Sequence, residues 1–253
     1  MRPEMLRVIP VIDVLNGVVV HAVKGNRQKY QPLQSVLTTS VNPLDVATVF
    51  KRQGFSELYI ADLDAILENK PNFALYSGLV QMGFNLLVDA GITAIETAKK
   101  LYSYGVSKII IGTETLPTIS FVNELIQQIS AEHIIISLDM KDNKILTPHN
   151  FSDSTEMSEL LKQLCRMSVT DFILLDLSRV GSNEGVNIDL LTQISTILTH
   201  NGNGGRVYVG GGIQSLDELL SLKKFDVLGV LLATALHSGK IDINTLKQTG
   251  LLF

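Results

Sequence analysis

The sequence contains little cysteine, no tryptophan and no excess of positive charge. Its single cysteine, Cys165, excludes an internal disulfide bond and favours a reducing compartment. Charged residues make up 18% of the chain and the formal net charge is −4, so the basic surface that nucleic acid requires is not expected. No apolar run approaches membrane-spanning length and no secretory signal is evident, so we expect a cytoplasmic protein without a membrane or nucleic-acid partner.

Patterns for metal and dinucleotide binding are missing as well. The five histidines are scattered, and none pairs with another at helical ligand spacing, so we expect no metal. The run of glycines at 210–212 is not followed by a ribose-binding acid about twenty residues further on within a mononucleotide fold. The sequence therefore gives no reason to expect a cofactor.

What the sequence does contain is a series of short apolar runs. Residues 8–13 (VIPVID) are too few for a helix, are rich in β-branched side chains, and end at Asp13. The same pattern returns at residues 133–139 (HIIISLD), which end at Asp139. A carboxylate at the end of a buried strand is costly unless it faces a cavity or is paired. Both aspartates are therefore candidate catalytic groups, with paired structural charges as the alternative.

Three further runs recur in the same order about half a chain later. Residues 58–64 (LYIADLD) are answered by 172–178 (FILLDLS), 86–92 (LLVDAGI) by 207–213 (VYVGGGI), and 109–113 (IIIGT) by 230–234 (VLLAT). The chain is therefore predicted to be one domain, residues 1–253, made of two homologous halves, about 1–126 and 127–253, with four strands each.

A helical segment follows each predicted strand. Start and stop signals predict helices over 43–54, 72–83, 94–104, 117–130, 155–167, 187–199, 215–223 and 242–249. We expect capping boxes at Thr93 with Glu96 and at Ser215 with Glu218. Residues 24–32 are expected to form an active-site loop, 66–71 a connecting loop and 201–205 a turn.

The order of these elements predicts an α/β fold of one kind. Near-continuous apolar strands are typical of a parallel sheet that is buried on both faces. An open doubly wound sheet has fewer such units and no internal repeat, so we predict a single (β/α)8 TIM barrel built from two half-barrels. The first and fifth strands lie opposite each other in such a barrel. Asp13 and Asp139 should therefore face each other across its mouth.

Glycines between the seventh strand and its helix predict an anion site. Backbone amides without a neighbouring Cβ can approach a phosphate, and barrels commonly bind phosphate in the loops after strands seven and eight. A plain tight turn is the alternative. The phosphate-binding candidates are Gly211, Gly212, Ala233 and Thr234. The repeat implies a second site on the opposite side, formed by Gly91, Gly112 and Thr113.

Over essentially its whole length the chain resembles the histidine-biosynthesis barrel family. The resemblance rests on residues 9–14 (IPVIDV), 16–20 (NGVVV), 24–25 (KG), 61–63 (ADL), 138–139 (LD), 176–179 (DLSR) and 209–213 (VGGGI). This family includes ProFAR isomerase (phosphoribosylformimino-aminoimidazole-carboxamide ribotide isomerase) and the cyclase subunit of imidazole glycerol phosphate synthase. The strand-one loop and Gly239–Lys240 are more similar to the isomerase, and Ala233–Thr234 to the cyclase.

The resemblance implies a cofactor-free Amadori rearrangement, in which an aminoaldose phosphate becomes an aminoketose phosphate. It makes Asp13 the base and Asp139 the acid, two roles that this chemistry needs on opposite sides of the sugar. Asp176, His21 and Ser182 are candidates for supporting roles. The implied partner is a phosphorylated small-molecule substrate, and we expect a monomer or a homodimer.

Several positions depart from the family pattern. Leu175 stands where the isomerase carries a threonine near the reacting centre, Val180 replaces an aspartate, and His21 stands where a basic residue is usual. The first triple glycine has become Asp89-Ala90-Gly91, which places a carboxylate where an anion would sit. We expect Asp89 either to turn away or to weaken or abolish the first phosphate site.

Three functions remain open at this point. The first is a divergent paralogue that uses the two aspartates for isomerase-type chemistry on another substrate, for example a singly phosphorylated sugar or heterocycle. The second is a genuine ProFAR isomerase with altered loops. The third is a non-catalytic barrel that binds a phosphate ligand, which is favoured if neither Asp13 nor Asp139 opens into a pocket. A cyclase is disfavoured because the chain shows no sign of the glutaminase partner that reaction needs.

Overall fold

A closed barrel of eight parallel strands stands at the centre of the residues that the structure describes. The computed structural model describes residues 6–149, 151, 156–182, 184–200 and 205–252. The barrel strands, in the order in which they pair, are β1 (Arg7–Leu15), β4 (Glu57–Asp62), β5 (Asn85–Asp89), β6 (Lys108–Gly112), β7 (Ile134–Lys141), β9 (Asp171–Asp176), β10 (Arg206–Gly210) and β11 (Val227–Leu232). β11 pairs with β1, which closes the barrel. The predicted TIM barrel is confirmed, and its origin from two half-barrels stays a prediction.

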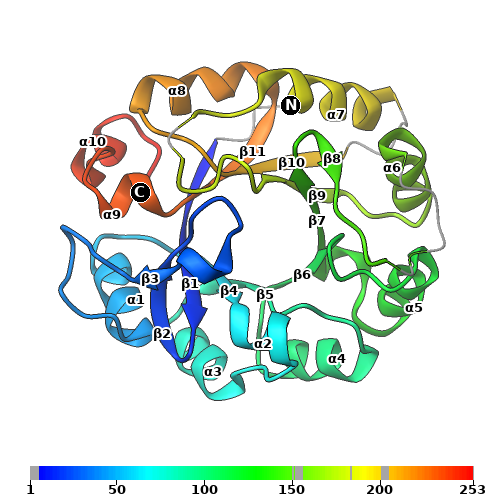
Figure 1. Cartoon of the computed structure of the whole chain (residues 1–253), viewed down its shortest axis with the longest axis horizontal. Helices are drawn as coiled ribbons and strands as arrows, with labels where there is room; N and C mark the ends of the chain where they lie inside the picture. Colours follow the sequence, from blue (N-terminus) through cyan, green and yellow to red (C-terminus); the bar gives the residue numbers. More distant parts are fainter. Residues whose placement is uncertain (1–5, 150, 152–155, 183, 201–204, 253) are drawn as a thin grey trace.

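Helices surround the barrel on all sides (Figure 1). They are α1 (Pro43–Arg52), α2 (Leu63–Glu68), α3 (Phe73–Gln81), α4 (Ile95–Ser103), α5 (Ile119–Ile129), α6 (Met157–Arg166), α7 (Ile188–His200), α8 (Leu216–Ser221), α9 (Thr234–His237) and α10 (Ile243–Gln248). α2 covers part of the range expected as a loop at 66–71, which corrects that prediction. In the described part of the chain, no helix has both the length and the apolar character needed to cross a bilayer.

Side-chain caps begin most of the predicted helices. Asn42 and Thr118 accept backbone amides at the starts of α1 and α5, and Ser215 accepts the Glu218 amide at the start of α8. The capping box expected at Thr93 is wrong, because α4 starts one residue later, with Ala94 at the cap position and no side-chain hydrogen bond. The turn expected at 201–205 lies mostly outside the described residues.

Two apolar layers follow from the alternation of side chains along each strand. Residues on one face, such as Ile12, Val88 and Ile136, pack against the helices. Residues on the other face fill the inside of the barrel, with Ile9, Tyr59, Leu87, Ile110, Ile135, Ile173 and Tyr208 forming its core. This internal layer blocks the barrel as a channel, so a cavity can form only beyond it, toward the strand ends.

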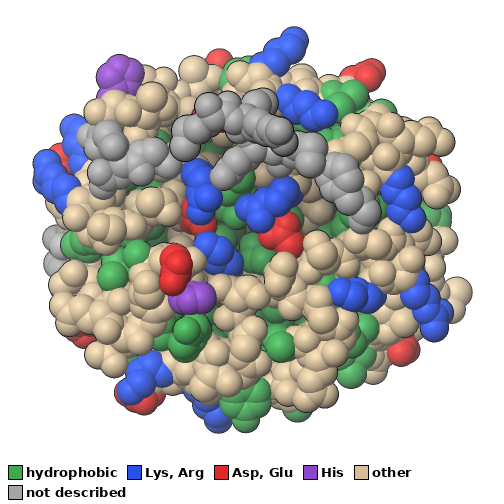
Figure 2. Space-filling view, turned by 180° about the vertical axis from the view of Figure 1, so that it is seen from behind, with side chains coloured by type: hydrophobic (Ala, Val, Ile, Leu, Met, Phe, Trp, Pro, Cys, Tyr) green, Lys and Arg blue, Asp and Glu red, His purple; other side chains and the backbone are tan. Residues whose placement is uncertain are grey.

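The amino ends of the strands carry charges that pair with one another. Arg7 Nη1 lies 2.8 Å from Glu57 Oε1. The buried Asp171 lies 2.7 Å from Lys108 Nζ and 2.6 Å from Arg206 Nη2. Each of these residues is the first of its strand, and charges of both signs gather near the middle of the face opposite to that of Figure 1 (Figure 2). This end of the barrel is therefore closed by ion pairs.

The chain after β1 folds back into two short strands that the sequence did not indicate. β2 (Val18–His21) runs antiparallel to β1, and β3 (Gln31–Pro32) pairs with β2. The expected loop at 24–32 therefore contains a short 3-10 helix, Arg27–Lys29, and the strand β3. At β7 the strand β8 (Lys144–Ile145) makes a similar hairpin. Both hairpins extend the barrel wall beyond the carboxyl ends of the strands.

Candidate active site

A cavity of about 210 Å³ opens at the carboxyl ends of the barrel strands. Asp13 from β1, Asp89 from β5 and Asp139 from β7 line it. Their orientation follows from strand alternation, since each lies two residues after an inward-facing position of its strand. β1 and β7 are separated by three strands in either direction around the barrel. The structure thus brings the two predicted aspartates together in one cavity from opposite walls.

Asp13 is half-buried and lacks a partner of its own. No hydrogen bond or ion pair involves its carboxylate within the described residues, although its backbone pairs with β2 and β4. Burial, followed by the negative charge of Asp89, raises the pKa of Asp13 from 3.8 to about 7. A carboxyl group that titrates near neutral pH can both take up and release a proton there.

Asp139 is held firmly at the end of β7. Its Oδ1 accepts a hydrogen bond from Ser137 Oγ at 2.8 Å, and its Oδ2 accepts one from the backbone amide of Glu114 at 3.1 Å. A Cβ at Gly112 would lie 2.7 Å from Oδ2, so glycine leaves the room this carboxylate needs. Burial, followed by the charge of Asp89, raises the pKa of Asp139 to about 7 in spite of both donors.

Asp89 is a third carboxylate in the cavity, so it does not turn away, and the other alternative, a weakened or lost first phosphate site, stays a prediction. Its Oδ2 accepts a hydrogen bond from the Tyr59 hydroxyl at 3.3 Å, and its Oδ1 accepts one from the Gly91 amide at 3.2 Å. Burial raises the pKa of Asp89 to about 6, and these two hydrogen bonds oppose the rise. Its charge in turn raises the pKa of Asp13 and Asp139, which couples the three groups.

The candidate phosphate residues of the second half line the same cavity. Gly211, Gly212, Ala233 and Thr234 all contribute to its wall. Gly211 and Gly212 have φ angles of +97° and +84°, which favour glycine. A Cβ at Gly212 would also overlap the carbonyl oxygen of Gly185, in the loop after β9. Tight packing therefore accounts for part of the glycine run, and phosphate binding there stays a prediction.

The three candidate phosphate residues of the first half are described but do not line the cavity. The Gly91 amide donates to Asp89, and Gly112 makes room for Asp139. Thr113 is fully buried, and its hydroxyl accepts a hydrogen bond from the Asp139 amide at 3.0 Å. The φ of +58° at Gly91 and the contacts of Gly112 and Thr113 account for the three residue types without an anion, so a phosphate site there stays an untested prediction.

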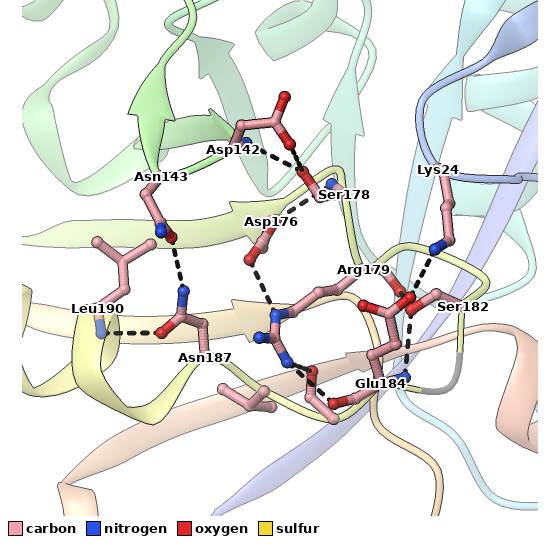
Figure 3. A network of polar contacts seen from close by, with 12 residues as sticks. Lys24, Asp142, Asn143, Asp176, Ser178, Arg179, Ser182, Glu184, Asn187 and Leu190 are labelled. Carbon is pink, nitrogen blue, oxygen red and sulfur yellow. Dashed lines mark hydrogen bonds and ion pairs between the residues drawn. The ribbon is translucent and has the colours of Figure 1, made fainter.

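The supporting candidates separate into two groups. His21 lines the cavity, whereas Asp176 and Ser182 do not. Asp176 lies on the outer face of β9, accepts the Ser178 amide at 3.1 Å, and lies 3.3 Å from Arg179 Nε (Figure 3). Ser182 Oγ donates to the Arg179 carbonyl oxygen at 2.8 Å. These two side chains shape the loop after β9 from behind the cavity.

That loop contacts the segment that follows β2. Lys24 Nζ lies 2.5 Å from Glu184 Oε1 (Figure 3), and the Lys24 amide donates to the Val180 carbonyl oxygen at 2.8 Å. A Cβ at Gly181 would overlap the Ala22 carbonyl oxygen, so the two segments pack backbone to backbone. Gly25, Val180 and Gly181 also line the cavity, so this contact covers part of its mouth.

Sequence reasoning missed several cavity residues. Tyr59 shares the inward-facing side of β4 with Ala61, a position that strand alternation could have indicated. Arg27 Nη2 pairs with Glu114 Oε2 at 2.9 Å over the cavity, and no sequence pattern links residues this far apart. Burial, followed by the charge of Asp13, raises the pKa of Tyr30 to about 12. This phenol therefore stays protonated and can donate a hydrogen bond.

His237 is a further cavity residue and is 3% exposed. Its Nδ1 lies 2.9 Å from Ser35 Oγ, and its Nε2 has no hydrogen-bond partner in the described chain. Burial, followed by the charge of His21, lowers the pKa of His237 to about 4, so the ring is neutral at pH 7.

The fold and the cavity define a (β/α)8 barrel protein whose ionisable carboxyl groups sit at the carboxyl ends of opposite strands. A comparison with known families makes this more specific. The model described as "Histidine biosynthesis protein" matches residues 7–242, so the chain belongs to that family.

Relatives within the family include isomerases. The chain is 28% identical over 250 residues to the 1-(5-phosphoribosyl)-5-((5-phosphoribosylamino)methylideneamino) imidazole-4-carboxamide isomerase of Gloeothece citriformis, covering 96% of this chain and 92% of that protein. It is 29% identical over 239 residues to the isomerase of the same name from Methanosphaera stadtmanae, covering 93% and 96%. An uncharacterized protein of Methanocaldococcus jannaschii is more similar, with 37% identity over 242 residues that cover 94% and 96%.

Proposed function

We propose that the protein is an isomerase that converts an aldose into a ketose by acid–base chemistry on a phosphorylated sugar or ribonucleotide-type substrate. The observation that carries this proposal is the shared cavity of Asp13 and Asp139, two carboxyl groups from opposite walls with pKa values of about 7. Membership of a family that contains named isomerases supports the reaction class. A non-catalytic barrel would be favoured if neither aspartate opened into a pocket, whereas both line the cavity.

The reaction needs only proton transfers. One carboxyl group donates a proton to the ring oxygen as the C1–O bond breaks, which leaves a cationic iminium at C1 of an aminoaldose. The other carboxylate removes the proton from C2, and the released electron pair forms the C1–C2 double bond and neutralises the iminium. Return of a proton to C1 and loss of the C2 hydroxyl proton complete the aminoketose. No electron leaves the substrate, so no redox partner is required.

The family resemblance assigns the base to Asp13 and the acid to Asp139, and we keep this assignment as the proposal. The hydrogen bonds that Asp139 accepts favour its ionised form, whereas the Asp13 carboxylate accepts none within the described residues. Asp13 would therefore act as a base only once the substrate donates hydrogen bonds to it. A substrate labelled with deuterium at C2 should show a primary isotope effect in the wild type, and exchange of that position with solvent should disappear in Asp13→Asn.

Genuine ProFAR isomerase activity is the second candidate, and the isomerase relatives support it. Leu175 and Asp89 argue for a different substrate, because both line the cavity where the family pattern has a hydroxyl and a glycine. A direct assay with ProFAR decides between the two. Two results together would assign the protein to histidine synthesis. The wild type should turn over ProFAR and restore growth of a histidine auxotroph, and both Asp13→Asn and Asp139→Asn should abolish the turnover.

If the wild type does not turn over ProFAR, assays of the wild type and the two variants on other substrates show whether the proposed chemistry is retained. Folded wild-type protein that does not act on ProFAR but isomerises another sugar phosphate, with turnover lost in Asp13→Asn and Asp139→Asn, would retain the proposed chemistry on another substrate. Full activity of Asp13→Asn on any substrate that is found would contradict the proposal, because the variant cannot supply a carboxylate base. Melting curves of the two variants serve as the folding control.

A further inference from the structure

The turns after β5 and β10 differ in one respect that bears on the substrate. Both follow a strand on opposite sides of the barrel, and both end in a glycine with positive φ, Gly91 at +58° and Gly212 at +84°. β5 ends in Asp89, which accepts the Gly91 amide at 3.2 Å, whereas β10 ends in Gly210, which has no side chain to do so. The Gly212 amide donates to no group within the described residues. The backbone amide of Gly212 in the turn after β10 can therefore donate to an anion. The corresponding Gly91 amide in the turn after β5 already donates to the Asp89 carboxylate.

Three carboxyl groups gather on the side of the cavity around Asp89. Asp13 and Asp139 line it together with Asp89, and Tyr59 is the side chain that donates to Asp89. Among the described residues, two cations line the cavity: Arg27, which pairs with Glu114, and the exposed Lys141. A phosphate on this side would meet carboxylates that are partly shielded from water, where like charges repel more strongly than in bulk water.

Hydrogen-bond donors of a substrate, by contrast, would bind to the unfilled acceptor positions of the carboxylates on this side of the cavity. The Asp13 carboxylate has no partner, and Asp89 accepts two hydrogen bonds although two carboxylate oxygens offer about four acceptor positions. No group of three or more acidic, histidine or cysteine side chains in the described chain has the geometry of a metal site. Hydroxyl or amino groups of an organic substrate therefore fit these carboxylates.

We propose that Asp89 is a specificity-determining residue that limits the substrate to a single phosphate. The phosphate binds beside Gly212 and Thr234, and the other end of the substrate presents hydroxyl or amino groups to Asp13 and Asp89. This inference rests on the proposed function, since it assumes that the cavity binds a phosphorylated substrate. It differs from a preference for two phosphates, which would need open turns after both β5 and β10.

Fructose 6-phosphate and fructose 1,6-bisphosphate form a matched pair of probes, because they differ by one phosphate. Titration calorimetry at pH 8 should show that the wild type binds the bisphosphate at least about tenfold more weakly than the monophosphate, given one like-charge contact in a poorly solvated site. Asp89→Asn keeps the size of the side chain and should remove most of that difference. Asp89→Gly, which frees the Gly91 amide, should bind the bisphosphate more tightly than the wild type does.

Asp226→Asn is the matched control, because it removes the same charge from an exposed residue with φ of +56° that lies outside the cavity. It should bind both sugars as the wild type does. Equal binding of the two sugars by the wild type, or a bisphosphate penalty that persists in Asp89→Asn, would overturn the role of Asp89 and leave the proposed function intact. Binding of neither sugar nor inorganic phosphate, by wild-type protein that melts cooperatively, would overturn both proposals.

Discussion

Replacing Asp13 with asparagine removes a buried negative charge while nearly keeping the shape of the side chain. The folded protein holds the pKa of Asp13 at about 7, whereas the unfolded chain returns it to about 3.8. The folded state therefore binds the proton more tightly, and stability is lost as the pH rises from about 4 through about 7. At pH 8 the wild type carries this cost in full, and Asp13→Asn does not carry it.

The pKa difference sets an upper limit of about 4 kcal/mol on this cost. The opening of the cavity to solvent reduces the expected gain to about 2 kcal/mol at pH 8. At pH 4.5 the carboxyl group is protonated in the fold, so most of this cost is absent and the stability gain of Asp13→Asn should be much smaller than at pH 8. The variant should thus be more stable than the wild type at alkaline pH while lacking isomerase activity.

Urea unfolding followed by circular dichroism at pH 4.5 and pH 8 measures this effect through the transition midpoints, provided that the slopes stay equal. Asp226→Asn, which removes an exposed charge, should leave the midpoints unchanged at both pH values. A stability difference between Asp13→Asn and the wild type that does not depend on pH would refute the reasoning, because it would mean that burial does not raise the pKa of Asp13.

Three further substitutions test other parts of the structure. Asp171→Asn removes the buried charge that pairs with Lys108 and Arg206, so it should lower the unfolding free energy by about 2 kcal/mol in urea melts. An unchanged value would contradict the closing role of these ion pairs. Lys24→Met removes the exposed contact with Glu184 that covers part of the cavity mouth, so KM should rise several-fold while the melting temperature stays the same. A fall in melting temperature with an unchanged KM would point to a structural role instead. Gly112→Ala places a methyl group against Asp139 Oδ2, so it should lower the free energy of unfolding by about 1–3 kcal/mol and shift the acidic limb of the pH–rate profile. A profile identical to that of the wild type would rule out this contact.

Some features of the cavity followed directly from strand alternation. Side chains two residues apart share a face of a strand, so Asp13 shares the inner face of β1 with Ile9, and Asp89 that of β5 with Leu87. The same rule places Asp176 on the outer face of β9, beside Leu174. Strand alternation therefore could have removed Asp176 from the cavity and placed Asp89 in it before the structure was known.

Local signals were less dependable at helix starts and in the loop after β1. Thr93 has the residue type of a cap, but α4 begins at Ile95, so its hydroxyl caps nothing. Residues 24–32 read as a polar loop because two-residue strands and a single 3-10 turn are too short to leave a periodic pattern. Their pairing with β2 depends on the hairpin that forms once β1 is in place.

The sequence by itself determined the barrel and the opposite placement of Asp13 and Asp139, because apolar strands that recur with helices between them have one common solution and alternation assigns each face. Only the tertiary structure decided which groups meet inside the cavity. The pairing of Arg27 with Glu114, the Tyr59 hydroxyl on Asp89, and the close packing of Gly112 against Asp139 join different strands and loops. Such contacts exist only when barrel closure brings the strand ends together. The same closure removes the carboxylates from water, and this burial raises their pKa values.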